Sequence, residues 1–393
     1  MSESIHHSES IYNCLRENGL CQCFTHTVIK HIMAILIAVF SRGYKGKTVQ
    51  FERSSPYCRT TVAHFLNRGK WDSDKLESVL QQAVIDLIYG ESMRTGKPVL
   101  CLVDDTISSK TKPSSRAGHP IEDAHWHQSH LKKKQDYGHQ AVSVALSCNG
   151  ISLNYAIVLY DKSRSKIQIL LDIAEKLPEA PVLSYFLCDS WYTSVKVMKA
   201  FLKKGFYTIG AVKSNRVIYP AGIKQQIGQF APFLRKTDSN VRLVTVGTRK
   251  FYVYRYEGKL NEIENAVVLI SYPKDAFGVP AALRAFISTD ASLSTMEILN
   301  FYAERWEIEV FFRQAKQKLA MDKYQIRSSQ GIRRFWLLMS LAYFVCCTGT
   351  GGILSFEDGY RFFQNALIKE RVEFIYCCAS EHIPVVDVLN AIT

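Results

Sequence analysis

Three carboxylates occupy positions where an acidic side chain has a chemical use. Asp105, or its neighbour Asp104, ends the apolar run PVLCLVDD, and Asp189 ends the run PVLSYFLCD. Glu309 lies in the later segment YAERWEIEVFFRQAKQKL. A carboxylate at the end of a buried strand is costly unless water, a partner or a metal ion satisfies it. Carboxylate oxygens suit Mg²⁺ or Mn²⁺, and two such ions can support phosphodiester hydrolysis.

The segment that contains Glu309 has the residue spacing of an amphipathic helix. At 100° per residue, Tyr302, Arg305, Glu309 and Lys316 fall within about 60° of arc, beside a separate apolar stripe. Such a face could bind a metal ion through its glutamate and DNA phosphates through its two cations. The neighbouring Trp306 could stack on an exposed base.

Each of these features also has a purely structural interpretation. An aspartate at a strand end often caps a turn or a helix. A helix with opposite charges four residues apart is often an ordinary surface helix with salt bridges. The residue types alone leave both interpretations open.

The elements that must position the carboxylates form a mixed α/β pattern. Residues 1 to about 95 show helical periodicity. Residues 97–215 then predict three strands, including one hairpin, followed by helix, strand, helix and strand. The Cys-Asn-Gly-Ile sequence at 148–151 predicts the hairpin turn, since Asn-Gly is the strongest short hairpin signal. Two strands thus end in an aspartate, at the sheet edge where α/β folds place their chemistry.

The rest of the chain divides into a β-rich segment and helices. Residues 216–280 have their own strand alternation, and a strand at 281–290 leads into one long predicted helix from about Ser292 to Leu319. Near the amino end, residues 54–71 fit either the second helix of a helix-turn-helix or a plain helical bundle. The apolar runs fall short of the roughly 20 residues of a membrane-spanning helix, so we expect no membrane partner.

Positive charge is concentrated in four segments. Residues 41–70, 110–134, 213–264 and 302–334 together carry a net +20, so the other residues carry −7 to make the formal net charge of +13. Basic stretches on an otherwise acidic chain are typical of a track for a phosphate backbone. A solvated face explains any single stretch, but DNA binding explains the four together better.

A histidine-rich stretch overlaps the basic segment 110–134. Contact with DNA is one interpretation of this part of the chain and a polar loop is another, whereas the spacing gives little support to a zinc site. The histidines concerned are His119, His125, His127, His130 and His139.

Four residues of the helical segment match a known signature. Tyr302, Arg305, Glu309 and Lys316 have the spacing Y-x2-R-x3-E-x6-K, in which the chain resembles the bacterial DDE transposases of the insertion sequence 4 family. The segments VDDT and LCDSWYTS are similar to those that hold the family's first and second catalytic aspartates. The resemblance covers residues 97–348, about two thirds of the chain.

The resemblance implies an α/β fold with an RNase H-like mixed sheet and flanking helices. The implied organisation is a helical DNA-end-binding domain at 1–95, a catalytic domain in two parts at 96–215 and 281–348, a β-rich insertion at 216–280 and a helical C-terminal region at 349–393. The strand order derived from the residues agrees with this fold.

The resemblance also implies a site. Asp105, Asp189 and Glu309 would bind the catalytic ions, Mg²⁺ or Mn²⁺, and Asp105 is preferred to Asp104 because Thr106 follows it. The residues implied to contact the transposon-end DNA are Tyr302, Arg305 and Lys316.

The expected function is cut-and-paste transposition. The protein would bind terminal inverted repeats of double-stranded DNA as a homodimer, hydrolyse phosphodiester bonds and join the 3′ ends to target DNA, in the bacterial cytoplasm at the nucleoid. Two alternatives stay open: a relative without catalysis that acts as a DNA-binding protein, and another RNase H-like nuclease. The three carboxylates argue against the first, and the Tyr-Arg-Glu-Lys helix argues against the second.

Overall fold

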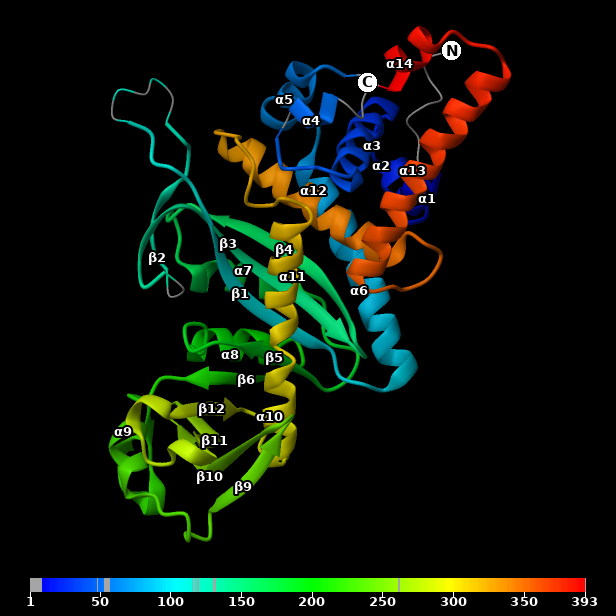
Figure 1. Ribbon diagram of the computed structural model, residues 1–393. Coiled ribbons are helices and arrows are strands. Elements are labelled where there is room, and N and C mark those ends of the chain that lie inside the picture. The colour runs from blue at the N-terminus through cyan, green and yellow to red at the C-terminus, as the bar shows by residue number, and fades with distance from the viewer. Residues whose placement is uncertain are drawn as a thin grey trace.

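Helices form both ends of the chain and strands form its middle (Figure 1). The computed structural model describes residues 9–47, 49–52, 57–114, 116, 118, 120–129, 132–260 and 262–392. The helices are α1 (Glu9–Glu17), α2 (Leu20–Cys23), α3 (His26–Phe40), α4 (Val49–Glu52), α5 (Arg59–Asn67), α6 (Ser73–Thr95), α7 (Lys166–Lys176), α8 (Val195–Leu202), α9 (Ile227–Phe230), α10 (Thr295–Ala303), α11 (Trp306–Gln317), α12 (Ser329–Thr348), α13 (Phe356–Ser380) and α14 (Val385–Ile392). The strands are β1 (Leu100–Ser109), β2 (His125–Ser129), β3 (Lys134–Cys148), β4 (Ile151–Tyr160), β5 (Ser184–Cys188), β6 (Phe206–Val212), β7 (Val217–Ile218), β8 (Gln225–Gln226), β9 (Val241–Val246), β10 (Arg249–Leu260), β11 (Ile263–Pro273) and β12 (Arg284–Ser288).

A ten-stranded mixed sheet runs through the molecule. Its strand order is β2-β3-β1-β5-β6-β12-β11-β10-β9, with β4 paired to β3. β1 is antiparallel to β3 and parallel to β5, and β5 is parallel to β6. α7 and α8 lie between these parallel strands in the chain, as crossover helices must. The predicted α/β fold with flanking helices is therefore confirmed.

The Asn-Gly sequence forms the predicted hairpin between β3 and β4. Asn149 and Gly150 have φ values of 51° and 81°, the left-handed region that a type I′ turn needs at both central residues. Cys148 pairs with Ile151 across this turn, and the pairing continues to Gln140 and Tyr160. A local sequence signal thus sets the register of the two strands.

The β-rich segment extends the central sheet. β9, β10 and β11 form an antiparallel meander, and β11 also pairs with β12, which in turn pairs with β6. A separate apolar cluster, which includes Tyr256, Val268 and Ile287, packs this part of the molecule. The segment is therefore joined edge to edge with the strands that carry the aspartates.

A buried arginine joins the amino-terminal helices to α12. Arg334 is 3% exposed, and its guanidinium donates to the backbone oxygens of Phe65, Leu66 and Trp71. Its Cζ also lies 4.6 Å from the centre of the Trp71 ring. These bonds satisfy carbonyls at the end of α5, which the helix itself leaves without partners. Whether α5 enters DNA stays a prediction, as do the domain boundaries.

The structure corrects two predicted elements. The single helix expected from Ser292 to Leu319 is two helices, α10 and α11, separated by a turn at Glu304 and Arg305. In this turn the amide of Arg305 bonds to the oxygen of Tyr302, three residues back, so the helical ladder is interrupted. The short strand β2 was also missed, because its sequence HWHQS is polar and histidine-rich.

In the part of the chain that the structure describes, no helix is both long enough and apolar enough to cross a membrane.

Candidate functional site

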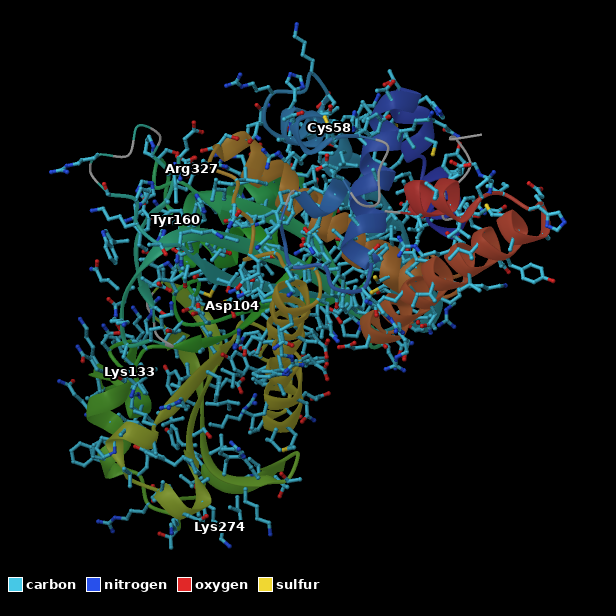
Figure 2. The ribbon with its side chains drawn as sticks, turned by 45° about the horizontal axis from the view of Figure 1, so that its top comes forward. Cys58, Asp104, Lys133, Tyr160, Lys274 and Arg327 are labelled. Carbon is cyan, nitrogen blue, oxygen red and sulfur yellow. The ribbon has the colours of Figure 1, made fainter. Side chains whose placement is uncertain are left out.

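The parallel strands β1 and β5 bring two aspartates to the same edge of the sheet. Leu102 pairs with Leu187 in this ladder, so the same register brings Asp189 level with Asp104 just beyond the paired residues. β5 ends at Cys188, directly before Asp189, as predicted. β1 instead continues past Asp104 to Ser109, so the prediction that this strand ends at its aspartates is wrong. Figure 2 labels Asp104 near the middle of the view, beside the yellow ribbon of α11.

Asp104 faces the helix that carries Glu309. Arg305 donates from Nη1 to Oδ2 of Asp104 at 2.9 Å and from Nη2 to Oε1 of Glu309 at 2.5 Å. Thr106, two residues along β1 and therefore on the same face, accepts a bond of 2.7 Å from Lys316 of the same helix. Two independent contacts thus show that the face of β1 with Asp104 is the face that meets α11.

Asp105 points to the opposite face of β1. Its Oδ1 accepts from Gln140 at 2.5 Å, and its Oδ2 accepts from Lys166 at 2.8 Å and from the hydroxyl of Tyr192 at 2.7 Å. Successive residues of a strand alternate between faces, so Asp104 and Asp105 cannot both reach α11. Asp105 remains the sequence-based prediction, but only Asp104 shares a partner with Glu309, so we carry Asp104 forward in the proposed set.

The mostly buried pair of Arg305 and Asp104 has shifted pKa values. Burial raises the pKa of Asp104 to about 6, although Arg305 acts in the opposite direction. Burial would also lower the pKa of Arg305, but Tyr302, Asp104 and Glu309 outweigh it and raise that pKa. Asp104 is therefore mostly ionised at neutral pH, and Arg305 always carries its charge.

The other residues of the signature differ in their surroundings. Tyr302 packs on Phe286 with ring centres 4.7 Å apart, and burial raises its pKa to about 12. Lys316 is half-buried, and its Nζ also donates to the oxygen of Ile107 at 2.9 Å. Burial lowers the pKa of Lys316. Trp306 is 54% exposed. The structure thus gathers Tyr302 and Arg305 around Asp104 and Glu309, and it directs Trp306 to solvent.

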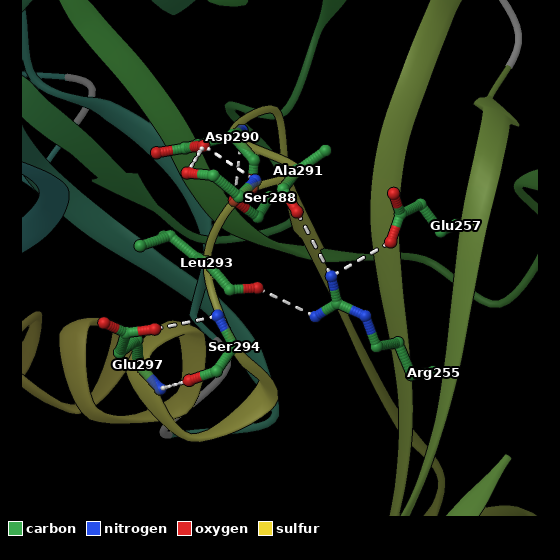
Figure 3. A network of polar contacts seen from close by, with 9 residues as sticks. Arg255, Glu257, Ser288, Asp290, Ala291, Leu293, Ser294 and Glu297 are labelled. Carbon is green, nitrogen blue, oxygen red and sulfur yellow. Dashed lines mark hydrogen bonds and ion pairs between the residues drawn. The ribbon is translucent and has the colours of Figure 1, made fainter.

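A polar network fixes the start of the helix pair that carries these residues (Figure 3). Arg255 of β10 donates to the backbone oxygens of Leu293 and Ala291, directly before α10. Ser294 and Glu297 then form a reciprocal capping box at the first turn of α10. The meander of β9–β11 therefore holds the amino end of the element that leads to Glu309.

Asp104, Asp189 and Glu309 offer carboxylate oxygens, the donors that a hard divalent cation prefers. Asp104 and Glu309 bind the same guanidinium, and the β1–β5 register brings Asp189 level with Asp104. Among the described residues, however, no group of three or more His, Cys, Asp or Glu side chains is arranged to hold a metal ion. Arg305 lies between Asp104 and Glu309 and binds both of them.

The histidine-rich segment contributes no such donor group among its described members. His119 and His130 lie outside the described residues. Nε2 of His139 lies 2.9 Å from the oxygen of Glu122, and its Nδ1 lies 2.9 Å from the hydroxyl of Tyr324. Burial lowers the pKa of His127 to about 4. These two rings are therefore part of the packing of β2 and β3.

The sequence did not predict two features of this region: the residues that surround Asp105 and the exposed aromatic side chain in the turn after Asp189. Lys166, Tyr192 and Gln140 surround Asp105, and Trp191 projects from the turn with 56% of its surface exposed. The available signal was the pair of aromatic residues directly after a strand-end aspartate, in the segment LCDSWYTS.

Gly210 of β6 sets the position of this turn. It pairs with Cys188, and a Cβ at this position would lie 2.6 Å from Cγ2 of Thr193 and 2.9 Å from Sγ of Cys188. We expect Gly210→Ala to lower the free energy of unfolding by about 1–3 kcal/mol, because the turn must shift to make room. Denaturant unfolding measures this loss.

A second substitution tests the same contact. Thr193→Ser removes Cγ2 and keeps the hydroxyl that donates to the oxygen of Ser190. The double variant Gly210→Ala, Thr193→Ser should lose less stability than the sum of the two single variants. Equal stability of Gly210→Ala and the wild type would contradict this account of the turn.

Comparison with known proteins identifies the domain that contains these residues. A family model described as Transposase DDE domain matches residues 95–345, well over half of the chain. This range includes Asp104, Asp189, Arg305 and Glu309. A search of curated proteins finds no match.

Proposed function

We propose that this chain, which belongs to the transposases with a DDE domain, cleaves DNA at a site formed by Asp104, Asp189 and Glu309. The observation that carries the proposal is the convergence of Asp104 and Glu309 on one cation, at the sheet edge where Asp189 follows β5. Carboxylates that lie level with one another on adjacent parallel strands, beside a third on a neighbouring helix, are suited to metal-assisted hydrolysis.

Mg²⁺, or Mn²⁺ in its place, would be held by the oxygens of these three side chains. When bound, the ions supply an activated water and stabilise the leaving oxygen of the phosphodiester. The protein's own contribution is to present Asp104 from β1 and to orient Glu309 from α11. Arg305 must leave both carboxylates before they can bind metal.

Arg305 has a second partner available once it is released. A guanidinium can pair with a DNA phosphate through two parallel hydrogen bonds, which replaces the two bonds that it makes to Asp104 and Glu309. DNA binding and opening of the metal site would therefore be one event. Tyr302, Trp306 and Lys316 complete the proposed DNA contacts on the same helix pair.

The wider function that we propose is that of an insertion sequence 4 family transposase. The chain would bind the terminal inverted repeats as a homodimer, cut the element from double-stranded DNA and transfer its 3′ ends to target DNA, at the bacterial nucleoid. The Tyr-Arg-Glu-Lys spacing and the four basic segments support this proposal.

Glu309→Gln tests the proposal. The variant keeps the size of the side chain and its place on α11, but loses a charged oxygen donor. We expect it to shift a duplex that carries the element's end in a gel, with an affinity close to that of the wild type, and to nick that duplex about 10³-fold more slowly with Mg²⁺.

Two outcomes would contradict the proposal in different ways. Nicking by Glu309→Gln at the wild-type rate would remove Glu309 from the site. A wild-type protein that binds the same duplex and never nicks it, with either Mg²⁺ or Mn²⁺, would instead indicate a DNA-binding relative without catalysis.

A further inference from the structure

The turn after Asp189 presents an exposed indole between two cations. Trp191 is 56% exposed, whereas Tyr192 and Thr193 beside it are buried. Nζ of Lys166 lies 5.4 Å from the centre of the Trp191 ring, and Nζ of Lys213 lies 5.5 Å from it. A large aromatic side chain left in water next to positive charge is typical of a surface that binds another group.

Three hydrogen bonds hold the turn that carries Trp191. Its amide donates to Oδ1 of Asp189 at 2.9 Å, and the hydroxyl of the next residue, Tyr192, donates to Asp105. Arg216 donates to the oxygen of Thr193 at 2.6 Å. The backbone that presents the indole is therefore already ordered, so the turn loses little conformational entropy when a ligand stacks on the ring.

The two cations differ in what they can still bind. Lys166 is mostly buried and paired with Asp105 at 2.8 Å, so it holds its position beside the ring. Lys213 is exposed and follows β6, on the same side of the turn as the indole. An aromatic face beside an available ammonium group matches a nucleotide, whose base can stack while its phosphate is neutralised.

We propose that Trp191 is a stacking platform for an unpaired nucleobase of the DNA strand that passes Asp189, and that Lys213 neutralises a phosphate beside that base. The inference rests on the proposed function, because it takes the ligand to be DNA. It adds a contact on the Asp189 side of the site to those proposed for α10 and α11.

Binding to two DNA probes tests the proposal. One probe is a fluorescein-labelled duplex with a central run of mismatched thymines, and the other is the same duplex fully paired, both in EDTA so that no cleavage occurs. We expect the wild type to prefer the mismatched probe, and Trp191→Ala to weaken binding to that probe about 5- to 100-fold while binding to the paired probe changes less than about twofold.

Three variants serve as controls. Trp191→Phe keeps an aromatic face and should retain most of the preference for the mismatched probe. Lys213→Ala should weaken binding to both probes by a similar factor, because phosphates are common to both. Tyr376→Ala removes an aromatic ring from α13 that is even more exposed than Trp191 and should leave both affinities unchanged.

The outcomes that overturn the inference are distinct from failure of the proposed function. If Trp191→Ala lost the same affinity for both probes, or for neither, Trp191 would not bind an unpaired base. A wild-type protein that binds neither probe would contradict the DNA-cleaving function itself. Thermal unfolding of each variant shows whether the fold is intact.

Discussion

Asp104→Asn is expected to abolish metal-dependent DNA cleavage, with a fall in rate of about 10³-fold or more. The substitution keeps the side chain's shape and its place on β1 facing α11, but it replaces a charged ligand that is worth several kcal/mol in the transition state. The measurement is the nicking rate with Mg²⁺ on a supercoiled plasmid that carries the ends of the element.

Asp105→Asn is the matched control for that experiment. It makes the same chemical change one residue along the strand, on the face that meets Lys166, Tyr192 and Gln140. It should lower the free energy of unfolding by about 1–3 kcal/mol, because a partly buried charge network loses its centre. Its nicking rate should stay within about tenfold of the wild type. The reverse order of the two nicking rates would falsify the assignment of Asp104.

Arg305→Ala is expected to separate metal binding from DNA binding. Without the guanidinium, Asp104 and Glu309 lose the cation that bridges them, and their mutual repulsion favours a metal ion in its place. We expect the DNA-free variant to bind Mn²⁺ about tenfold more tightly than the wild type, as measured by electron paramagnetic resonance or calorimetry. Its affinity for the element's end should fall about 10- to 100-fold, because a two-armed phosphate contact is lost.

Arg305→Lys distinguishes charge from geometry at this position. An ammonium group keeps the charge but cannot bridge two carboxylates or bind a phosphate through a planar fork. The lysine variant should therefore lie between the wild type and the alanine variant in both affinities. If the alanine variant bound Mn²⁺ no better than the wild type, Arg305 would not be the group that closes the metal site.

The parts of the fold that were predicted from sequence are those with local signals. The Asn-Gly turn determines the β3–β4 hairpin, and the apolar runs before Asp104 and Asp189 mark β1 and β5, although β1 continues to Ser109. The alternation in residues 241–273 predicted strands correctly, but not their place in the central sheet. That pairing depends on contacts between β11 and β12, which are distant from the local pattern.

The choice between Asp104 and Asp105 was beyond the sequence for a physical reason. Both residues are aspartates and are adjacent in the chain, so neither composition nor spacing distinguishes them. Only the register of β1 against β5 and the packing of α11 decide which face each one takes. The contact between Arg305 and Asp104 was also beyond the sequence. The spacing of Arg305 and Glu309 predicts a salt bridge between those two residues, but only the packing of α11 on β1 adds Asp104 as a second partner.

The most direct test of the central claim is to locate the bound metal. Iron(II) substituted for Mg²⁺, with ascorbate and peroxide, generates hydroxyl radicals that cut the polypeptide next to the metal site. In the DNA complex we expect cuts near residues 104, 189 and 309, which excess Mg²⁺ suppresses and Asp104→Asn abolishes. Cuts confined to the histidine-rich segment around residues 125–139, or a pattern unchanged by Asp104→Asn, would contradict the account.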